Sequence, residues 1–198
     1  HYSKLAVEET RLPKAAQHLA WLDMHTEAGI EYWLAMNLAG DYAAACHNRI
    51  HRELSRAMGV TAVARIENHH NFAWKETIDG RELIVHRKGA TPAGKGVHGI
   101  IPGSMSAPGY IVRGKGEPVS LHSAAHGAGR KMSRSRASQS ITNNAMKEEL
   151  KAKGIILIGG GLDEAPQAYK DIETVMKAQT NLVEVIGSFQ PKLVRMDG

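Results

Sequence analysis

A histidine lies on a glycine-rich segment that leads into a run of basic residues. Residues 125–130 read Ala-His-Gly-Ala-Gly-Arg, and Arg134 follows shortly after them. Glycine lets the backbone approach a ligand and present N–H groups to phosphate oxygens, while arginine neutralises phosphate charge. In such a loop His126 can contact a phosphate, act as a general acid or act as a nucleophile. The segment predicts a phosphate site; the alternative is a flexible turn with an exposed histidine.

A pair of histidines stands just before a predicted hairpin. His69 and His70 are adjacent, and Asn71 follows them. Neighbouring side chains on a strand point to opposite faces, so the two imidazoles cannot easily share one metal ion. Imidazole is the commonest neutral metal ligand, yet an isolated histidine pair is more often no metal site. We expect one of the two to be a metal ligand at most, and the other to be packed or exposed.

Two further segments have the composition of a ligand loop without being specific for one. Residues 99–105 (Gly-Ile-Ile-Pro-Gly-Ser-Met) predict a rigid loop with unusual backbone angles. Residues 87–89 (Arg-Lys-Gly) place Lys88 at the end of a strand, where it can reach a phosphate. The alternative for Arg87 and Lys88 is an ordinary solvated strand end.

A cysteine and two histidines on a predicted helix invite a zinc interpretation. His47 and His51 stand at positions i and i+4, directly after Cys46. Arg49 and no acid stands between the histidines, so the metalloprotease pattern with its general base is absent. We interpret all three as ordinary helix residues. Residues 159–161, three glycines, lack a phosphate-loop lysine or a dinucleotide-binding spacing and predict only a turn.

The elements that must position these residues begin with a helical segment. Up to about Gly59, apolar residues recur at spacings of three and four, which predicts helix, with breaks at Gly29 and Gly40. From Ala62 the spacing changes toward two. Residues 72–77 and 82–86 then flank an Asp-Gly pair at 79–80, which is a strong hairpin signal.

The remainder predicts short elements without regular strand–helix–strand alternation. The fold class expected is therefore α+β, with mixed sheets and peripheral helices preceded by the helical segment. The expected elements are loops over 89–116 around a strand at 110–112, a strand at 118–119, a loop over 120–130, a helix over 138–151, a buried strand at 155–158, a helix over 169–178, and a final strand pair at 182–186 and 193–195.

Composition favours a soluble protein with an anionic partner. The 198 residues carry a formal net charge of +5, and the basic residues gather beside the glycine-rich segments, which favours phosphate or nucleic-acid binding. No apolar run is long enough to span a membrane, and no signal peptide opens the chain. A single cysteine excludes an internal disulfide and fits a reducing, cytoplasmic location.

Taken together and in order, these segments resemble the RtcB family of RNA-splicing and RNA-repair ligases, which use GTP and manganese. The resemblance is strong over residues 61–198 and loose over the preceding helices at 1–60. The segments that carry it are residues 67–71 (Glu-Asn-His-His-Asn), 87–90 (Arg-Lys-Gly-Ala), 99–105, 125–130, and 164–171 (Glu-Ala-Pro-Gln-Ala-Tyr-Lys-Asp).

The resemblance implies a reaction and a set of site residues. The family joins RNA 2′,3′-cyclic phosphate or 3′-phosphate ends to 5′-hydroxyl ends through a guanylyl-histidine. Carried over, His126 is the nucleophile, His70 a manganese ligand and Lys88 a basic residue acting through a phosphate, while Arg130 and Arg134 contact phosphate or RNA. The residues that match the guanylate-binding loops are Asn71, Pro102, Gly103, Ser104, Met105, Gly127, Ala128 and Gly129.

The chain also departs from the family pattern. The remaining metal ligands belong to an N-terminal metal-binding half that matches nothing here, so we expect residues 61–198 to be the guanylate-binding half and the chain alone to be inactive. The family usually has serine at Gly109, glycine at Ser106 and a lysine near Asp197, which leaves guanine selectivity open. Two rival functions remain, a noncatalytic RNA-binding module and a metal-dependent phosphoesterase.

Overall fold

A computed structural model describes residues 1–196 of the chain, and the fold is α+β, as the sequence predicts. Two compact units divide it, residues His1–Ala64 and residues Arg65–Gly198. The first unit is helical, and the second combines small sheets with short helices. Asp197, where the resemblance led us to expect a lysine, lies outside the described residues.

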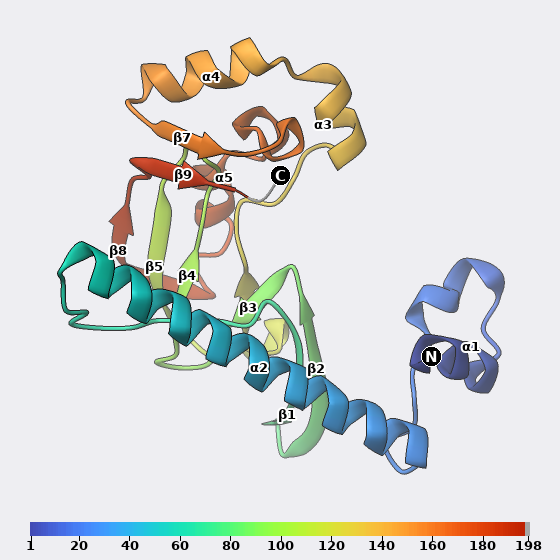
Figure 1. The fold of residues 1–198 in the computed structure, drawn as a ribbon. Coiled ribbons are helices and arrows are strands. Elements are labelled where there is room, and N and C mark those ends of the chain that lie inside the picture. The colour runs from blue at the N-terminus through green and yellow to red at the C-terminus, as the bar shows by residue number, and fades with distance from the viewer. Residues whose placement is uncertain (197–198) are drawn as a thin grey trace. The chain divides into compact units, whose positions relative to one another are not determined.

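The first unit consists of α1 (Tyr2–Thr10), the 3₁₀ helix η1 (Lys14–Leu19) and the long helix α2 (Glu27–Met58) (Figure 1). The predicted breaks at Gly29 and Gly40 are wrong, because α2 runs through both. Gly29 lies in its first turn, where an added Cβ would stand 2.0 Å from the carbonyl oxygen of Asp23. A single interior glycine such as Gly40 costs only about 1 kcal/mol, which a long helix tolerates.

The second unit opens with the predicted hairpin. Strands β1 (Asn71–Ile78) and β2 (Arg81–Lys88) pair antiparallel from Asn71 opposite Lys88 to Ile78 opposite Arg81. Asp79 and Gly80 form the two-residue turn with φ of 51° and 75°, the geometry that Asp-Gly favours in hairpins. The predicted hairpin is thus confirmed.

Among residues 1–196, three short strands lie where loops were predicted, whereas the strands predicted at 110–112 and 182–186 are present. Strand β4 (His98–Ile101) pairs with β5 (Gly109–Gly114), and β5 pairs with β8 (Val183–Phe189) in a three-stranded antiparallel sheet (Figure 1). Strand β3 (Ala90–Pro92) pairs with β6 (Ser123–Ala125). Residues 118–119, predicted as a strand, instead belong to the 3₁₀ helix η2 (Pro118–Ser120). The loops predicted over 89–116 and 120–130 therefore contain strands that exist through distant pairing.

The end of the chain pairs differently from the prediction. Strand β9 (Leu193–Arg195) runs parallel to β7 (Ile156–Gly159) and does not pair with β8. Strand β7 is also not buried, since Ile156 is 63% exposed. The helix predicted over 138–151 is two helices, α3 (Arg134–Ser140) and α4 (Asn143–Ala152), because the Thr142 hydroxyl accepts a hydrogen bond from Ala145 N–H and begins a new helix.

Two apolar clusters hold the second unit together. The first gathers β4, β5 and β8 with α5 (Ile172–Lys177), and Ala128 of the histidine loop belongs to it. The second joins α4 to the segment after β4 through Met105, Met146 and Leu150. The 3₁₀ helices η3 (Leu162–Glu164) and η4 (Pro166–Ala168) lie between β7 and α5 in sequence. Both clusters therefore include a residue from one of the predicted ligand loops.

Candidate active site

His126 and His70 lie together, although residues 71–125 separate them in the sequence. Their rings stack with centroids 5.3 Å apart and an interplanar angle of 16°. His126 directly follows β6, and His70 directly precedes β1. The structure thus brings the predicted nucleophile against the predicted metal ligand.

Gly89 joins these two histidines through its backbone. Its N–H donates to the carbonyl oxygen of His70 (3.2 Å), and its carbonyl oxygen accepts from the N–H of His126 (3.4 Å). Its φ of 72° is left-handed, a conformation that favours glycine, and a Cβ there would lie 3.7 Å from Nδ1 of His126. The Arg-Lys-Gly segment therefore matters through its glycine as well as its lysine.

The adjacent histidine, His69, belongs to a different environment. Its ring stacks on Phe72 with centroids 5.2 Å apart, and Phe72 in turn meets Trp74 edge-on. His69 and His70 thus contact different partners, as expected for neighbouring residues in an extended chain.

The two glycine-rich loops are in contact through their backbones. Ala128 N–H donates to the carbonyl oxygen of Pro102 (3.0 Å), and a Cβ added at Gly127 would lie 3.0 Å from the same oxygen. The side chain of Met105 is 4% exposed and lies in the core, as does that of Ala128. At these two positions the backbone is the part that can face a ligand.

Lys88 and Asn71 lie opposite each other at the open end of the hairpin, and both are exposed. Gly103 and Ser104 are half-buried in the loop after β4, where Ser104 O accepts from Ala107 N–H in a turn (3.2 Å). Gly129 has a φ of 69°. Of the two basic residues that end strand β2, Arg87 is buried and Lys88 is exposed to solvent beside Gly89.

Arg87, which the sequence analysis treated as a strand end, is buried and bonded on all sides. Its guanidinium donates to both carboxylate oxygens of Glu76 (2.6 and 2.8 Å), to Ser123 Oγ (2.8 Å) and to Leu121 O (2.9 Å). It also lies over the ring of Trp74, 4.9 Å from the centroid. Arg87 therefore ties the hairpin to the segment that leads into β6.

Arg130 and Arg134 are both paired with acids. Arg134 contacts Asp163 and Glu164, which raise the pKa of its guanidinium, chiefly through the hydrogen bond to Asp163. Arg130 lies 3.6 Å from Glu164 and stacks over Tyr169, 5.2 Å from the ring centroid. Burial, and then its hydrogen bond to Glu164, raise the pKa of Tyr169. A phosphate here meets arginines whose charge is already partly neutralised.

Two loop positions, Ser106 and Gly109, at which the resemblance led us to expect other residues, are both in close contact with distant elements. Ser106 is 5% exposed, and its hydroxyl donates to Glu149 (2.5 Å) while Lys153 Nζ donates to its carbonyl oxygen (3.0 Å). Gly109 is covered by Phe189, because an added Cβ would lie 2.3 Å from the ring. The loop between them is thus held from α4 and from β8.

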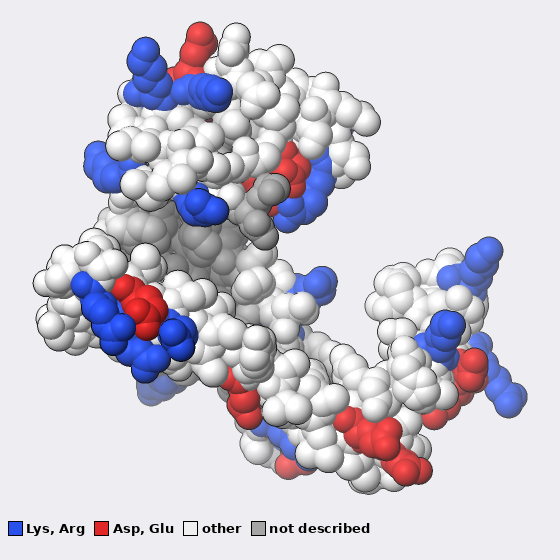
Figure 2. Space-filling view, in the orientation of Figure 1, with Lys and Arg blue, Asp and Glu red and all other residues white. Residues whose placement is uncertain are grey.

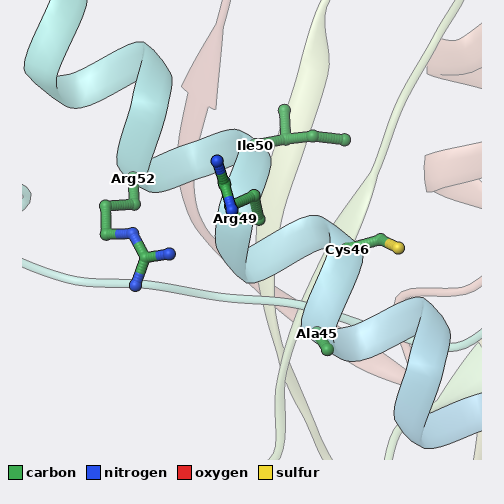
Figure 3. Close-up of a pocket in the computed structure, with 5 residues that line it drawn as sticks. All are labelled: Ala45, Cys46, Arg49, Ile50 and Arg52. Carbon is green, nitrogen blue, oxygen red and sulfur yellow. The ribbon is translucent and has the colours of Figure 1, made fainter.

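Within residues 1–196, no three His, Cys, Asp or Glu side chains converge as a metal site requires. His70, which the resemblance implies as a metal ligand, has one imidazole neighbour there, His126. A surface pocket on α2 is lined by Ala45, Cys46, Arg49, Ile50 and Arg52, with Arg52 and Cys46 on opposite sides of the helix (Figure 3). Cys46 is the only metal-ligand type among these five.

Charge on the first unit is mixed. Figure 2 shows basic side chains with an acid over the C-terminal half of α2. Arg49 and Arg56 both bind Glu53 there, at 3.3 and 3.0 Å. No helix in the described part of the chain is long and apolar enough to cross a membrane.

Proteins similar to this chain are named RNA-splicing or tRNA-splicing ligases. The RNA-splicing ligase RtcB of Escherichia coli K12 is 45% identical over 128 residues, which are 63% of this chain and 31% of that protein. The tRNA-splicing ligase RtcB of Nanoarchaeum equitans is 32% identical over 97% of this chain and 43% of its own length. The RNA-splicing ligase RtcB of Mycobacterium tuberculosis is 33% identical over 88% of this chain and 47% of its own.

A family model described as tRNA-splicing ligase RtcB matches residues 1–197. The chain belongs to the RtcB family, and the resemblance drawn from its motifs is confirmed. It spans less than half the length of each of these relatives.

Proposed function

We propose that this chain provides the nucleophile and nucleotide-binding half of a GTP- and Mn²⁺-dependent RNA ligase. Its substrates would be RNA with 2′,3′-cyclic phosphate or 3′-phosphate ends and RNA with 5′-hydroxyl ends, in tRNA splicing or RNA repair. The observation that carries this proposal is the stacking of His126 on His70 beside two loops that contact each other through Pro102 and Ala128. The relatives' names support the RNA substrate.

In the first step, a neutral imidazole of His126 attacks the α-phosphorus of GTP. An N–P bond forms, the bond from that phosphorus to the bridging oxygen breaks, and pyrophosphate leaves. The Nδ1–Cε1 edge of the ring faces Gly89, so Nε2 is the nitrogen farther from the backbone and better placed to reach a phosphate.

The remaining steps conserve the phosphate. Water first opens a cyclic phosphate to a 3′-phosphate, which then takes GMP from His126, so that the N–P bond breaks and a phosphoanhydride forms. The 5′-hydroxyl attacks the RNA phosphorus, a phosphodiester forms, and GMP leaves. Lys88, exposed beside Gly89, can neutralise phosphate charge there.

Manganese would supply Lewis-acid activation of the phosphates. His70 would hold it as one ligand, and an N-terminal half outside this chain would supply the others. We therefore expect the chain by itself to be inactive in ligation.

The test is retention of label. The chain, and the longest native polypeptide that contains it, are incubated with α-³²P-GTP and Mn²⁺, denatured and separated by electrophoresis. The proposal predicts acid-labile, alkali-stable label on the native polypeptide. RNA binding without label would indicate a noncatalytic RNA-binding module, and release of phosphate from RNA ends without label would indicate a phosphoesterase.

A further inference from the structure

The short strand β6 delivers His126 to the site, and its two edges are satisfied differently. One edge pairs with β3, with Ala125 opposite Ala90. On the other edge the N–H of Ala125, one residue before His126, donates to the side-chain oxygen Oε1 of Gln179 at 2.9 Å. A two-stranded sheet has no third strand to take this N–H, so a side chain takes it instead.

Gln179 is well fixed for this role. It is 4% exposed, and its side-chain Nε2 donates to Met176 Sδ (3.3 Å). Its backbone carbonyl oxygen accepts from the N–H groups of Leu182 (2.9 Å) and Val183 (3.2 Å). Met176 and Val183 belong to the first apolar cluster. The acceptor therefore stands on the turn between α5 and β8, in the most buried part of the unit.

The other end of β6 is held by Arg87. The guanidinium binds Ser123 Oγ and Leu121 O, and Glu76 fixes the guanidinium in turn. Two buried polar side chains from separate elements thus hold a strand of three residues, one at each end. Gln179 holds the end that carries the nucleophile.

We propose that Gln179 is a positioning residue for His126. Its amide oxygen fixes the Ala125 backbone, and so sets where the imidazole stands against His70 and Gly89. This inference rests on the proposed role of His126 as nucleophile. Gln179 would therefore act on the imidazole only through the backbone of Ala125.

Two substitutions separate the acceptor from the shape of the side chain. Gln179→Met keeps the length and the burial but removes the acceptor, leaving the Ala125 N–H unpaired. Gln179→Glu keeps an oxygen that can accept the same N–H. Thr142→Ala is the control for stability, because it removes the N-cap of α4 at a distance from β6.

The experiment uses the native polypeptide with two readouts. In single-turnover guanylylation, Gln179→Met should lower the rate at saturating GTP by roughly ten- to a hundredfold, because small displacements of a reacting group have effects of this size. The GTP concentration for half-saturation should stay within about twofold, since no nucleotide contact is removed. Gln179→Glu should recover most of the guanylylation rate. Thr142→Ala should keep the wild-type rate even though it loses as much thermal stability as Gln179→Met.

The second readout needs no nucleotide. Histidine labelled with ¹³C at Cε1 reports the stacking of His126 on His70 through its ring-current shift, with assignments from His126→Asn and His70→Asn. Gln179→Met should move the His126 resonance, and Thr142→Ala should leave it in place. An unmoved resonance in Gln179→Met overturns the positioning role, even if the wild type proves unable to react with GTP. Absence of labelling in the wild type with a moved resonance would instead refute the nucleophile and keep the positioning.

Discussion

At the residue scale, His126 lies in surroundings that restrict the orientation of its ring. It is half-buried, stacked on one imidazole and bonded through its backbone to Gly89. His69, one residue from the stacked partner, contacts Phe72 instead. A nucleophile must hold one orientation during attack, and this environment restricts the ring of His126 on two sides.

Replacing His126 with alanine should abolish covalent guanylylation in the native polypeptide, by roughly a thousandfold or more, because the attacking nitrogen is gone. The same variant should still seal RNA that already carries a 3′-terminal guanylate, since that substrate bypasses the first step. Labelling with α-³²P-GTP and gel analysis of sealed RNA measure the two reactions. His69→Ala is the matched control and should keep its label; persistent label in His126→Ala would reject the assignment.

Gly89→Ala should disturb the site more than its size suggests. A side chain at a φ of 72° costs about 1–2 kcal/mol, and relaxation of that angle moves the carbonyl that accepts from His126. Gly96→Ala is the matched control, because Gly96 also has a positive φ (81°) and a Cβ there would meet nothing within 4 Å. Similar melting temperatures with a slower guanylylation in Gly89→Ala alone are expected; equal rates would remove Gly89 from the site.

The sequence contains recognisable signals for the candidate site residues, but none for the residues that hold them in place. Glycine-rich segments and histidines have recognisable chemistry, so His126, His70 and the Pro102 loop were all singled out. Gln179 gave no signal, because a glutamine after a short helix resembles any solvated helix end. Arg87 was misinterpreted for a similar reason: only the folded chain shows that Glu76 and Ser123 surround it.

At the scale of elements, local signals succeeded where a turn determines the pairing. The Asp79-Gly80 turn fixes the register of β1 and β2 without help from distant residues. By contrast, β3 exists only through its pairing with β6, and β9 only through β7. Strands of three residues have little intrinsic preference, so their partners cannot be predicted from composition.

Helix α5 makes a testable contribution to acid stability. The Asp171 carboxylate caps it by accepting from Thr174 Oγ1 (2.7 Å) and Thr174 N–H (3.1 Å), and these bonds lower the pKa of Asp171 below its usual 3.8. A pKa that is lower in the folded chain stabilises the fold at any pH above the pKa of the unfolded chain. This contribution disappears as the pH falls through the pKa of the folded chain.

Asp171→Asn should therefore be less stable than the wild type at neutral pH, with a difference that shrinks as the pH falls below 3.8. Asparagine can still accept as a cap but carries no charge. Thermal unfolding followed between pH 7 and 3 measures the difference. Thr142→Ala, whose lost cap does not titrate, should give a difference independent of pH; the same behaviour in Asp171→Asn would contradict the assignment.

At the scale of the whole chain, the two units differ in how much they bury. Ala6 and Gly29 are the buried helical residues of the first unit, whereas both apolar clusters lie in the second. The candidate site lies entirely within the second unit, between residues 65 and 196. The contact between His126 and His70 therefore lies inside that unit.

Metal binding should expose the incompleteness of the site. The chain by itself should bind Mn²⁺ more weakly than micromolar, because a single imidazole is a poor ligand set for a divalent ion. Addition of the upstream half should give tight binding, and His70→Ala in that mixture should weaken it. Isothermal calorimetry measures all three; micromolar binding by the isolated chain would show that it holds a complete site.

Phe189 lies where a side chain at position 109 would go. The effects of substitutions at these two positions are therefore coupled. A mutation of Gly109 to serine in the present background expels a ring that is 46% exposed and leaves more apolar surface in water. After a prior change of Phe189 to a small residue, the same serine enters without displacement. The effect of serine at position 109 therefore depends on the residue at position 189, so the free-energy changes of the two substitutions should not add.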